Sequence, residues 1–231
     1  PCRSRPLGIA VVGGNITRLP ERTLIDITVL GRVRRSELVR RSTARPGDQV
    51  LVTGTLGDAA AGLRLALEPH LHHESADDQA VLNAYLQPQP RLPEAALLAR
   101  AGWASAMIDL SDGLSGDIQH ICQQSSVGVQ LHADWLPLSA AMPQVARRIG
   151  MDPWQLALTG GDDYELCFTA NPAHVEPIIA TLGRETGTTV TVIGAITAPT
   201  HGRQVRLPDG RDVSLDSTSW QHFALASTHK D

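Results

Sequence analysis

Residues 104–124, ASAMIDLSDGLSGDIQHICQQ, change from one structural pattern to another within a few positions. The first half is a short apolar run, which is typical of a buried β-strand. Ser111-Asp112-Gly113 then predicts a turn, and residues 114–124 have the pattern of a helix. Because a strand that turns into a helix is a building unit of α/β domains, this stretch predicts a mixed α/β fold.

The turn between this strand and this helix gathers two carboxylates and a hydroxyl, from Asp109, Asp112 and Ser111. Mg²⁺ takes oxygen ligands, typically one or two carboxylates together with substrate phosphates, and the free N–H groups of a helix start attract anions. An ordinary role is equally compatible with these residues, in which Ser111 or Asp112 caps the helix and Asp109 is solvated. The residues alone leave both interpretations open.

A second acidic stretch, GGDDYE at residues 160–165, comes at the start of a strand expected at 163–170. Two glycines allow a sharp turn and the close approach of a ligand. Three carboxylates within four positions would suit a cation, but an ordinary turn before an edge strand explains the residues slightly better.

Two glycine-containing turns nearer the N-terminus are weaker signals. Gly13-Gly14-Asn15 can expose backbone N–H groups to a phosphate, but the GK[ST] and GxGxxG patterns are absent. TGTLGD at 53–58 is interpreted as a strand-to-helix turn in which Asp58 is the N-cap.

The rest of the chain alternates between apolar strands and helices, which gives a fold class of α/β with α+β character. Strands are expected at 7–12, 23–33, 49–54, 104–110, 128–132, 163–170 and 189–196, helices at 59–67, 78–86, 93–101, 114–124, 139–149 and 172–182, and a hairpin at 205–215. An Arg-rich connector at 32–45 divides residues 1–34 from a C-terminal domain at 35–231.

Composition narrows the classes of function. The formal net charge of −4, without a dense basic face beyond the connector, argues against nucleic acid as the main partner. The three cysteines form no CxxC pair, so no zinc site or disulfide framework is expected, and reduced thiols suit a cytoplasmic protein. No apolar run has membrane-spanning length.

Four segments resemble thiamine-monophosphate kinases in residues and in order. They are GGNITR at 13–18, RPGDQVLVTGTLGDAAAGL at 45–63, MIDLSDGLSGDIQHI at 107–121 and LTGGDDYELCFT at 158–169. SWQHF at 219–223 is also similar to the family's ending. The resemblance implies the C-terminal domain of the aminoimidazole-ribonucleotide-synthetase-like fold, with residues 1–34 as the last strands of its N-terminal ATP-binding domain.

The resemblance also implies an activity, namely the ATP- and Mg²⁺-dependent phosphorylation of thiamine monophosphate to thiamine diphosphate. No catalytic side chain is implied, only binding positions. The matched positions are Asp109, Asp112 and Asn15 for the metal, Gly14, Asn15, Arg41 and Ser111 for ATP, and Asp162 and Trp220 for the thiamine substrate.

Three departures from the family's pattern affect these expectations. Asn15 stands where many relatives have Asp and brings no charge, and Asp162 is one methylene shorter than the Glu often found there. The family's N-terminal part, which carries further magnesium motifs, is absent, so the chain alone is expected to be inactive. A homodimer paired through N-terminal-domain strands is implied for the full protein.

Two alternatives stand beside this hypothesis. One is another enzyme of the same superfamily, such as a selenophosphate synthetase-like enzyme, against which Trp220 and the DDYEL stretch argue. The other is an inactive fragment or binding module of the same fold.

Overall fold

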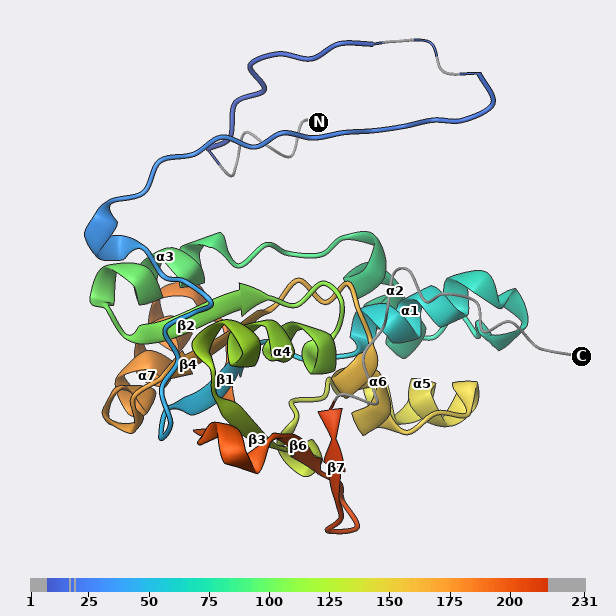
Figure 1. The fold of residues 1–231 in the computed structure, drawn as a ribbon. Coiled ribbons are helices and arrows are strands. Elements are labelled where there is room, and N and C mark those ends of the chain that lie inside the picture. Colours follow the sequence, from blue (N-terminus) through green and yellow to red (C-terminus); the bar gives the residue numbers. More distant parts are fainter. Residues whose placement is uncertain (1–7, 17, 19, 216–231) are drawn as a thin grey trace, which may run out of the picture. The chain divides into compact units, whose positions relative to one another are not determined.

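The computed structural model describes residues 8–215 apart from residues 17 and 19 (Figure 1). The chain divides into two compact units, Pro1–Arg35 and Ser36–Asp231. The second unit contains every helix longer than a single turn and every strand in the described part of the chain. None of the described helices is both long and apolar enough to cross a membrane.

The first unit lacks regular strands among its described residues, so the strands expected at 7–12 and 23–33 are not formed there. A strand is stable only when its backbone N–H and C=O groups are paired with a neighbour. Large apolar side chains in this unit are exposed instead, namely Ile9, Val11, Val12, Ile16, Leu24, Ile25, Ile27, Val29, Leu30 and Val33.

The second unit is built on a mixed sheet of seven described strands in the order β2-β4-β1-β5-β3-β6-β7. Neighbouring strands are antiparallel except β3 and β6, which are parallel. The strands are β1 Gln49–Thr53, β2 Ala104–Asp109, β3 Gly128–His132, β4 Leu166–Ala170, β5 Val190–Thr197, β6 Arg203–Arg206 and β7 Asp212–Ser214. The expected hairpin is confirmed, because β6 and β7 pair around a turn at Gly210.

Seven α-helices accompany the sheet in the described residues. They are α1 Asp58–Leu67, α2 Ala76–Leu86, α3 Leu92–Ala101, α4 Leu114–Ser125, α5 Met142–Ile149, α6 Pro153–Thr159 and α7 Val175–Thr186. Six of them agree with the expected helices to within a few residues, and α6 was not expected. The mixed α/β fold class predicted from the sequence is confirmed.

The alternation of side chains along the strands divides the core into layers. Val50 and Val52 of β1 belong to the cluster on one sheet face, with α4 and α6, whereas Leu51 packs on the other face with α3 and α7. This is the two-residue period expected of a strand that is buried on both faces. A separate apolar cluster joins α1, α2 and α5.

Two strands set the position of the site. β2 lies at the edge of the sheet and β4 is its neighbour, and the register pairs Asp109 with Leu166. The acidic stretch after β2 and the acidic stretch before β4 therefore leave the sheet side by side at the same end.

Candidate functional site at the edge of the sheet

The acidic stretches at residues 109–112 and 160–165 continue the pairing of β2 with β4 beyond the strands themselves. The Leu110 N–H donates to the Glu165 carbonyl at 2.8 Å, and the Tyr164 N–H donates to the Leu110 carbonyl at 2.8 Å. The Asp162 N–H donates to the Ser111 carbonyl at 2.9 Å. Two stretches that the sequence presents separately are therefore one structure.

Two glycines permit this close approach. A Cβ on Gly161 would lie 2.7 Å from the Ser111 carbonyl oxygen, which is shorter than any relaxed contact. Gly113 has φ of +94°, and a Cβ there would lie 2.8 Å from the Thr159 carbonyl oxygen. The two turns can pack backbone to backbone only because neither position carries a side chain.

Asp117 in the first turn of α4 fixes the loop that precedes the helix. Its Oδ2 accepts hydrogen bonds from the N–H groups of Ser111 and Asp112, both at 3.0 Å. Burial raises the pKa of Asp117, and the charges of Asp112 and Asp109 raise it further. The N-cap position of α4 is Gly113, which offers no side-chain bond. The capping role considered for Ser111 or Asp112 is therefore wrong, because Asp117 ties the loop down from inside the helix.

Asp109, Asp112, Asp162 and Tyr164 form what we call the edge cluster. Asp109 and Tyr164 are exposed, and Asp112 and Asp162 are half-buried. Burial raises the pKa of Tyr164, and the nearby charges of Asp162, Asp109 and Asp112 raise it further. The three carboxylates therefore all lie close enough to Tyr164 to disfavour its ionisation, and their negative charges are concentrated in the edge cluster.

Hydrogen bonds in the edge cluster involve few side chains. The Tyr164 hydroxyl donates to Oδ1 of Asp162 at 3.1 Å. Within the described part of the chain, no Lys or Arg forms an ion pair with Asp109 or Asp162. No group of three or more His, Cys, Asp or Glu arranged to hold a metal ion exists among the described residues. Asp109 and Asp112 can thus contribute oxygen ligands, but not a complete cage.

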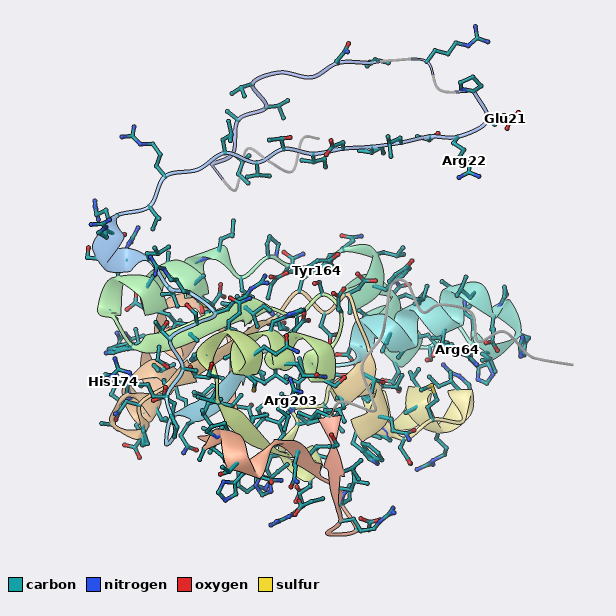
Figure 2. The ribbon with its side chains drawn as sticks, in the orientation of Figure 1. Glu21, Arg22, Arg64, Tyr164, His174 and Arg203 are labelled. Atoms are coloured by element: carbon teal, nitrogen blue, oxygen red, sulfur yellow. The ribbon has the colours of Figure 1, made fainter. Side chains whose placement is uncertain are left out.

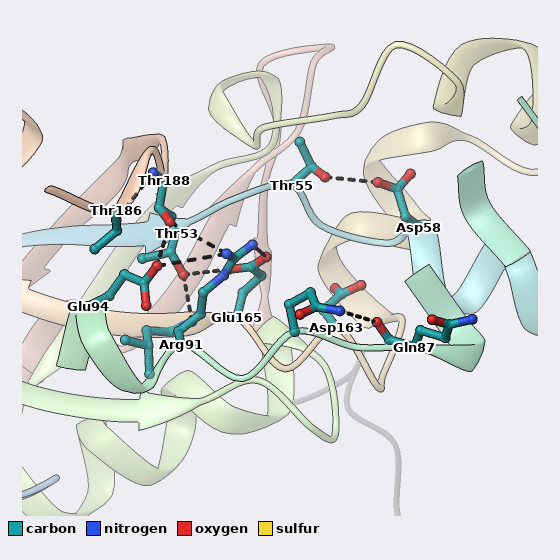
Figure 3. Close-up of polar contacts among 12 residues, drawn as sticks. Thr53, Thr55, Asp58, Gln87, Arg91, Glu94, Asp163, Glu165, Thr186 and Thr188 are labelled. Atoms are coloured by element: carbon teal, nitrogen blue, oxygen red, sulfur yellow. Dashed lines mark hydrogen bonds and ion pairs between the residues drawn. The ribbon is translucent and has the colours of Figure 1, made fainter. Parts of the chain in front are cut away.

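The next carboxylates along the second turn face the interior of the domain instead. Glu165 is buried and receives two hydrogen bonds from Arg91, at 2.7 Å and 2.6 Å, and one from the Thr53 hydroxyl at 2.6 Å. Figure 3 shows Arg91 between Glu165 and Glu94. Arg91 thereby joins the start of α3 to the segment that enters β4.

Asp163 serves the start of helix α1. Both of its carboxylate oxygens accept from the Gly57 N–H, at 3.0 Å and 2.9 Å, and burial raises its pKa well above the ordinary value. Asp58, expected to be the N-cap, is instead the first residue of α1, and its carboxylate accepts from the hydroxyls of Thr55 and Ser139. That expectation was wrong because the hydrogen-bond acceptor for the N–H group at the helix start comes from Asp163, in a distant segment, and not from a local side chain.

The structure brings together only part of the residue set expected to bind ligands. Asp109, Ser111, Asp112 and Asp162 meet at the sheet edge. The Arg41 carbonyl accepts from the Ser125 hydroxyl at the C-terminal end of α4, and the carbonyl of the preceding Arg40 accepts from the Met107 N–H at 3.2 Å. The Arg41 backbone therefore runs beside the middle of β2 and not in the turn that follows it.

Gly14 and Asn15 belong to the first unit, and Trp220 lies outside the described residues.

Three residues around the site were missed as functional or supporting positions. Asp117 and Tyr164 lie within or beside the acidic stretches, so their place in the sequence was a usable signal. Arg91 carried none, because its partner Glu165 is 74 positions away.

Comparison with known proteins agrees with the motifs. The family described as AIR synthase related protein, C-terminal domain, matches residues 45–205. Thiamine-monophosphate kinase from Salmonella typhimurium is 36% identical over 214 residues, which cover 93% of this chain and 63% of the relative. The resemblance inferred from the sequence is confirmed, and the chain spans less than two thirds of that relative's length.

Solved structures show the same similarity. The crystal structure of thiamine-monophosphate kinase from Stenotrophomonas maltophilia K279a has a TM-score of 0.68 at 37% identity, covering 78% of this chain and 55% of that one. A structure described as AaThiL complexed with AMPPCP and TMP has a TM-score of 0.66 at 33% identity, covering 80% and 54%.

Proposed function

The chain belongs to the family of AIR synthase related proteins through their C-terminal domain, and on that premise we propose that the protein is a thiamine-phosphate kinase. The reaction is the transfer of the terminal phosphoryl group of ATP to the phosphate of thiamine monophosphate, giving thiamine diphosphate and ADP. The observation that carries the proposal is the pairing of the two acidic stretches, which gathers Asp109, Ser111, Asp112 and Asp162 at one sheet edge.

The relatives support the choice of substrates. Proteins that match over 93% of this chain are thiamine-monophosphate kinases. The similar structure with bound AMPPCP and TMP holds an ATP analogue together with the phosphate ester that gives these enzymes their name. No observation on the described residues favours a selenophosphate synthetase-like enzyme or a binding module.

The residues of the edge cluster fit magnesium as part of a shared site. Asp109 and Asp112 offer only oxygen donors, and their mutual repulsion is relieved when a cation lies between them. Two carboxylates are the usual protein share of a magnesium site that is completed by substrate phosphates and water. Bound magnesium would neutralise charge on the phosphates. Asn15 remains a proposed further contact.

The chain's own groups then bind and orient the substrates. Asp162 presents a carboxylate to the cationic thiazolium or to the aminopyrimidine of thiamine, and Trp220 offers an aromatic face. Ser111 contributes its hydroxyl to ATP, and Arg41 and the turn at Gly14 provide the further nucleotide contacts.

We propose direct in-line transfer, because phosphoryl transfer depends mainly on positioning and charge neutralisation. The acceptor is the phosphate of thiamine monophosphate, so two anions must be held together. No covalent enzyme intermediate is part of this scheme.

Assembly and location follow from the same proposal. The exposed apolar side chains between residues 9 and 33 support a homodimer formed through this segment. A cytoplasmic location is proposed because Cys167 is a free thiol buried in the domain.

Titration calorimetry of this chain with thiamine monophosphate, and separately with thiamine, tests the proposed function. We expect thiamine monophosphate to bind and Asp162→Asn to weaken the binding about tenfold or more, because a charged partner of the ring is lost. Turnover with ATP and Mg²⁺ is not expected, because two carboxylates hold too few ions for two bound anions. Absence of binding to the unaltered chain, or an unchanged affinity in Asp162→Asn, would contradict the proposed site.

A further inference from the structure

The turn before β4 holds two residues in an unfavourable backbone conformation. Five non-glycine residues of the described chain have positive φ, and two of them are Asp162 at 65° and Tyr164 at 50°. The left-handed region is costly for residues with a Cβ, and more so for a bulky one such as tyrosine. Such strain persists only where the surroundings over-determine it, and it concentrates at functional sites.

The surroundings that impose this conformation belong to the neighbouring turn. The backbone N–H of each strained residue donates to a carbonyl of the segment after β2, Asp162 to Ser111 and Tyr164 to Leu110. Side chains along the turn therefore point alternately inwards and outwards. Asp163 and Glu165 point inwards, where Asp163 accepts from the Gly57 N–H and Glu165 accepts from Arg91. This alternation leaves the Asp162 and Tyr164 side chains bonded to each other.

Tyr164 contributes little to the core. Its residue exposure is 39%, and it belongs to none of the buried apolar clusters of the described residues. Figure 2 labels it on the segment that leads into β4. A large aromatic residue that is strained, exposed and not needed for packing calls for another role.

The hydrogen bond of the Tyr164 hydroxyl to Asp162 indicates what that role is. The Tyr164 O–H donates to Oδ1 of Asp162 at 3.1 Å, while Oδ2 has no hydrogen-bond partner among the described residues. We propose that Tyr164 is a positioning residue: it fixes the Asp162 carboxylate by one oxygen, so that the other oxygen faces the nitrogen heterocycle of the substrate. This inference rests on the proposed function, because it takes Asp162 as the carboxylate that binds the thiamine ring.

Fixing one oxygen strengthens binding by preorganisation. The carboxylate of a free Asp side chain rotates about its single bonds and loses this conformational entropy when a ligand binds. A hydrogen bond that already fixes the carboxylate lowers the entropic cost of binding. A hydrogen bond to a charged group is in the range that changes affinity about tenfold. The effect passes entirely through Asp162, and this dependence distinguishes a positioning residue from one that merely stabilises the fold.

A double-mutant cycle read by calorimetric titration with thiamine monophosphate tests the inference. Tyr164→Phe keeps the ring and the backbone conformation but removes the donor. Asp162→Gly removes the carboxylate and tolerates φ of 65° without strain. We expect Tyr164→Phe to weaken binding about tenfold in the unaltered background and to have no further effect in the Asp162→Gly background.

The control is Tyr85→Phe, at the other tyrosine of the chain, which lies half-buried in α2 and should bind like the unaltered protein. Unchanged affinity in Tyr164→Phe, while Asp162→Gly weakens binding, would overturn the positioning role and leave the proposed function intact. Equal losses from Tyr164→Phe in both backgrounds would also overturn it, since they indicate a general structural effect. If the unaltered chain fails to bind, the proposed function fails and the inference falls with it.

Discussion

Two groups of carboxylates in this domain have opposite surroundings. Asp78 and Glu165 are buried, and each is held by an arginine and by hydroxyl donors, from Arg148 and Ser75 in one case and from Arg91 and Thr53 in the other. Asp109 and Asp162 stand at the sheet edge beside other acids, and no Lys or Arg of the described chain forms an ion pair with either.

The difference separates charges that stabilise the fold from charges kept for a ligand. A buried carboxylate needs its partner inside the protein, because an unpaired buried charge is strongly destabilising. A carboxylate at an acidic edge gains little from the fold and is relieved by an external cation. Removing a member of the first group should therefore cost stability, whereas removing a member of the second should cost binding.

The largest loss of stability is expected from Arg91→Ala. This change leaves Glu165 and Glu94 buried without their cation, and breaking such a pair typically costs about 3 kcal/mol of unfolding free energy. Urea denaturation followed by circular dichroism measures it. Arg100→Ala, at an exposed position of α3, the helix that Arg91 precedes, is the matched control and should change stability by less than about 0.5 kcal/mol. Equal stabilities of the two variants would contradict the claim that buried, paired carboxylates stabilise the fold.

The next largest effect is the pH dependence due to Asp78. Burial raises its pKa, but hydrogen bonds from the His73 N–H, Ser75 and Arg148 outweigh that and lower the pKa to about 2. Because the folded pKa lies below the unfolded one, the stabilisation is present above about pH 4 and is lost as pH falls towards 2. It amounts to roughly 2 kcal/mol at neutral pH.

Urea titrations of the unaltered protein and of Asp78→Asn over this pH range measure the effect. The gap in unfolding free energy should shrink as the pH falls from 4 to 2. A gap of the same size at pH 7 and pH 2 would show that the charge of Asp78 contributes nothing.

The smallest stability change is expected at the edge cluster. Asp109→Asn keeps the shape of the side chain and removes one of the charges that raise the pKa values of Asp117 and Tyr164. Unfolding free energy should therefore stay within about 0.5 kcal/mol of the unaltered protein, with any shift towards higher stability. The same urea assay measures it, and a loss comparable with that of Arg91→Ala would remove the distinction between the two groups.

The sequence predicted much of this arrangement because local patterns determine it. The strand at 128–132 was expected with its observed bounds, and the strand-turn-helix unit at 104–124 within one residue at each end. These segments have a continuous apolar run or a helical period, and turn residues mark their ends. The acidic residues of the edge cluster were expected from their place in the two stretches.

What the sequence could not predict depends on contacts between distant segments. Asp163 accepts the hydrogen bond from the Gly57 N–H at the start of α1, although it lies 106 positions further along the chain. Local capping rules consider only nearby residues, and they therefore predicted Asp58 as the N-cap. Helix α6 has only seven residues between two turns, too few for a helical period to be recognised. Residues 163–165 were placed in β4, but left-handed backbone at Asp162 and Tyr164 delays the strand to Leu166.

The most direct test of the central claim is a map of backbone amide shifts by heteronuclear NMR as thiamine monophosphate, and then AMPPCP with Mg²⁺, is added to the chain. The account predicts the largest shifts at residues 109–113 and 160–164, with thiamine monophosphate acting mainly on the second stretch and the nucleotide mainly on the first. The chemical shifts of amides around Asp78 and Arg148 should not change. Largest shifts at the Asp78 region, or none at the two acidic stretches, would contradict the claim that the sheet edge is the ligand site.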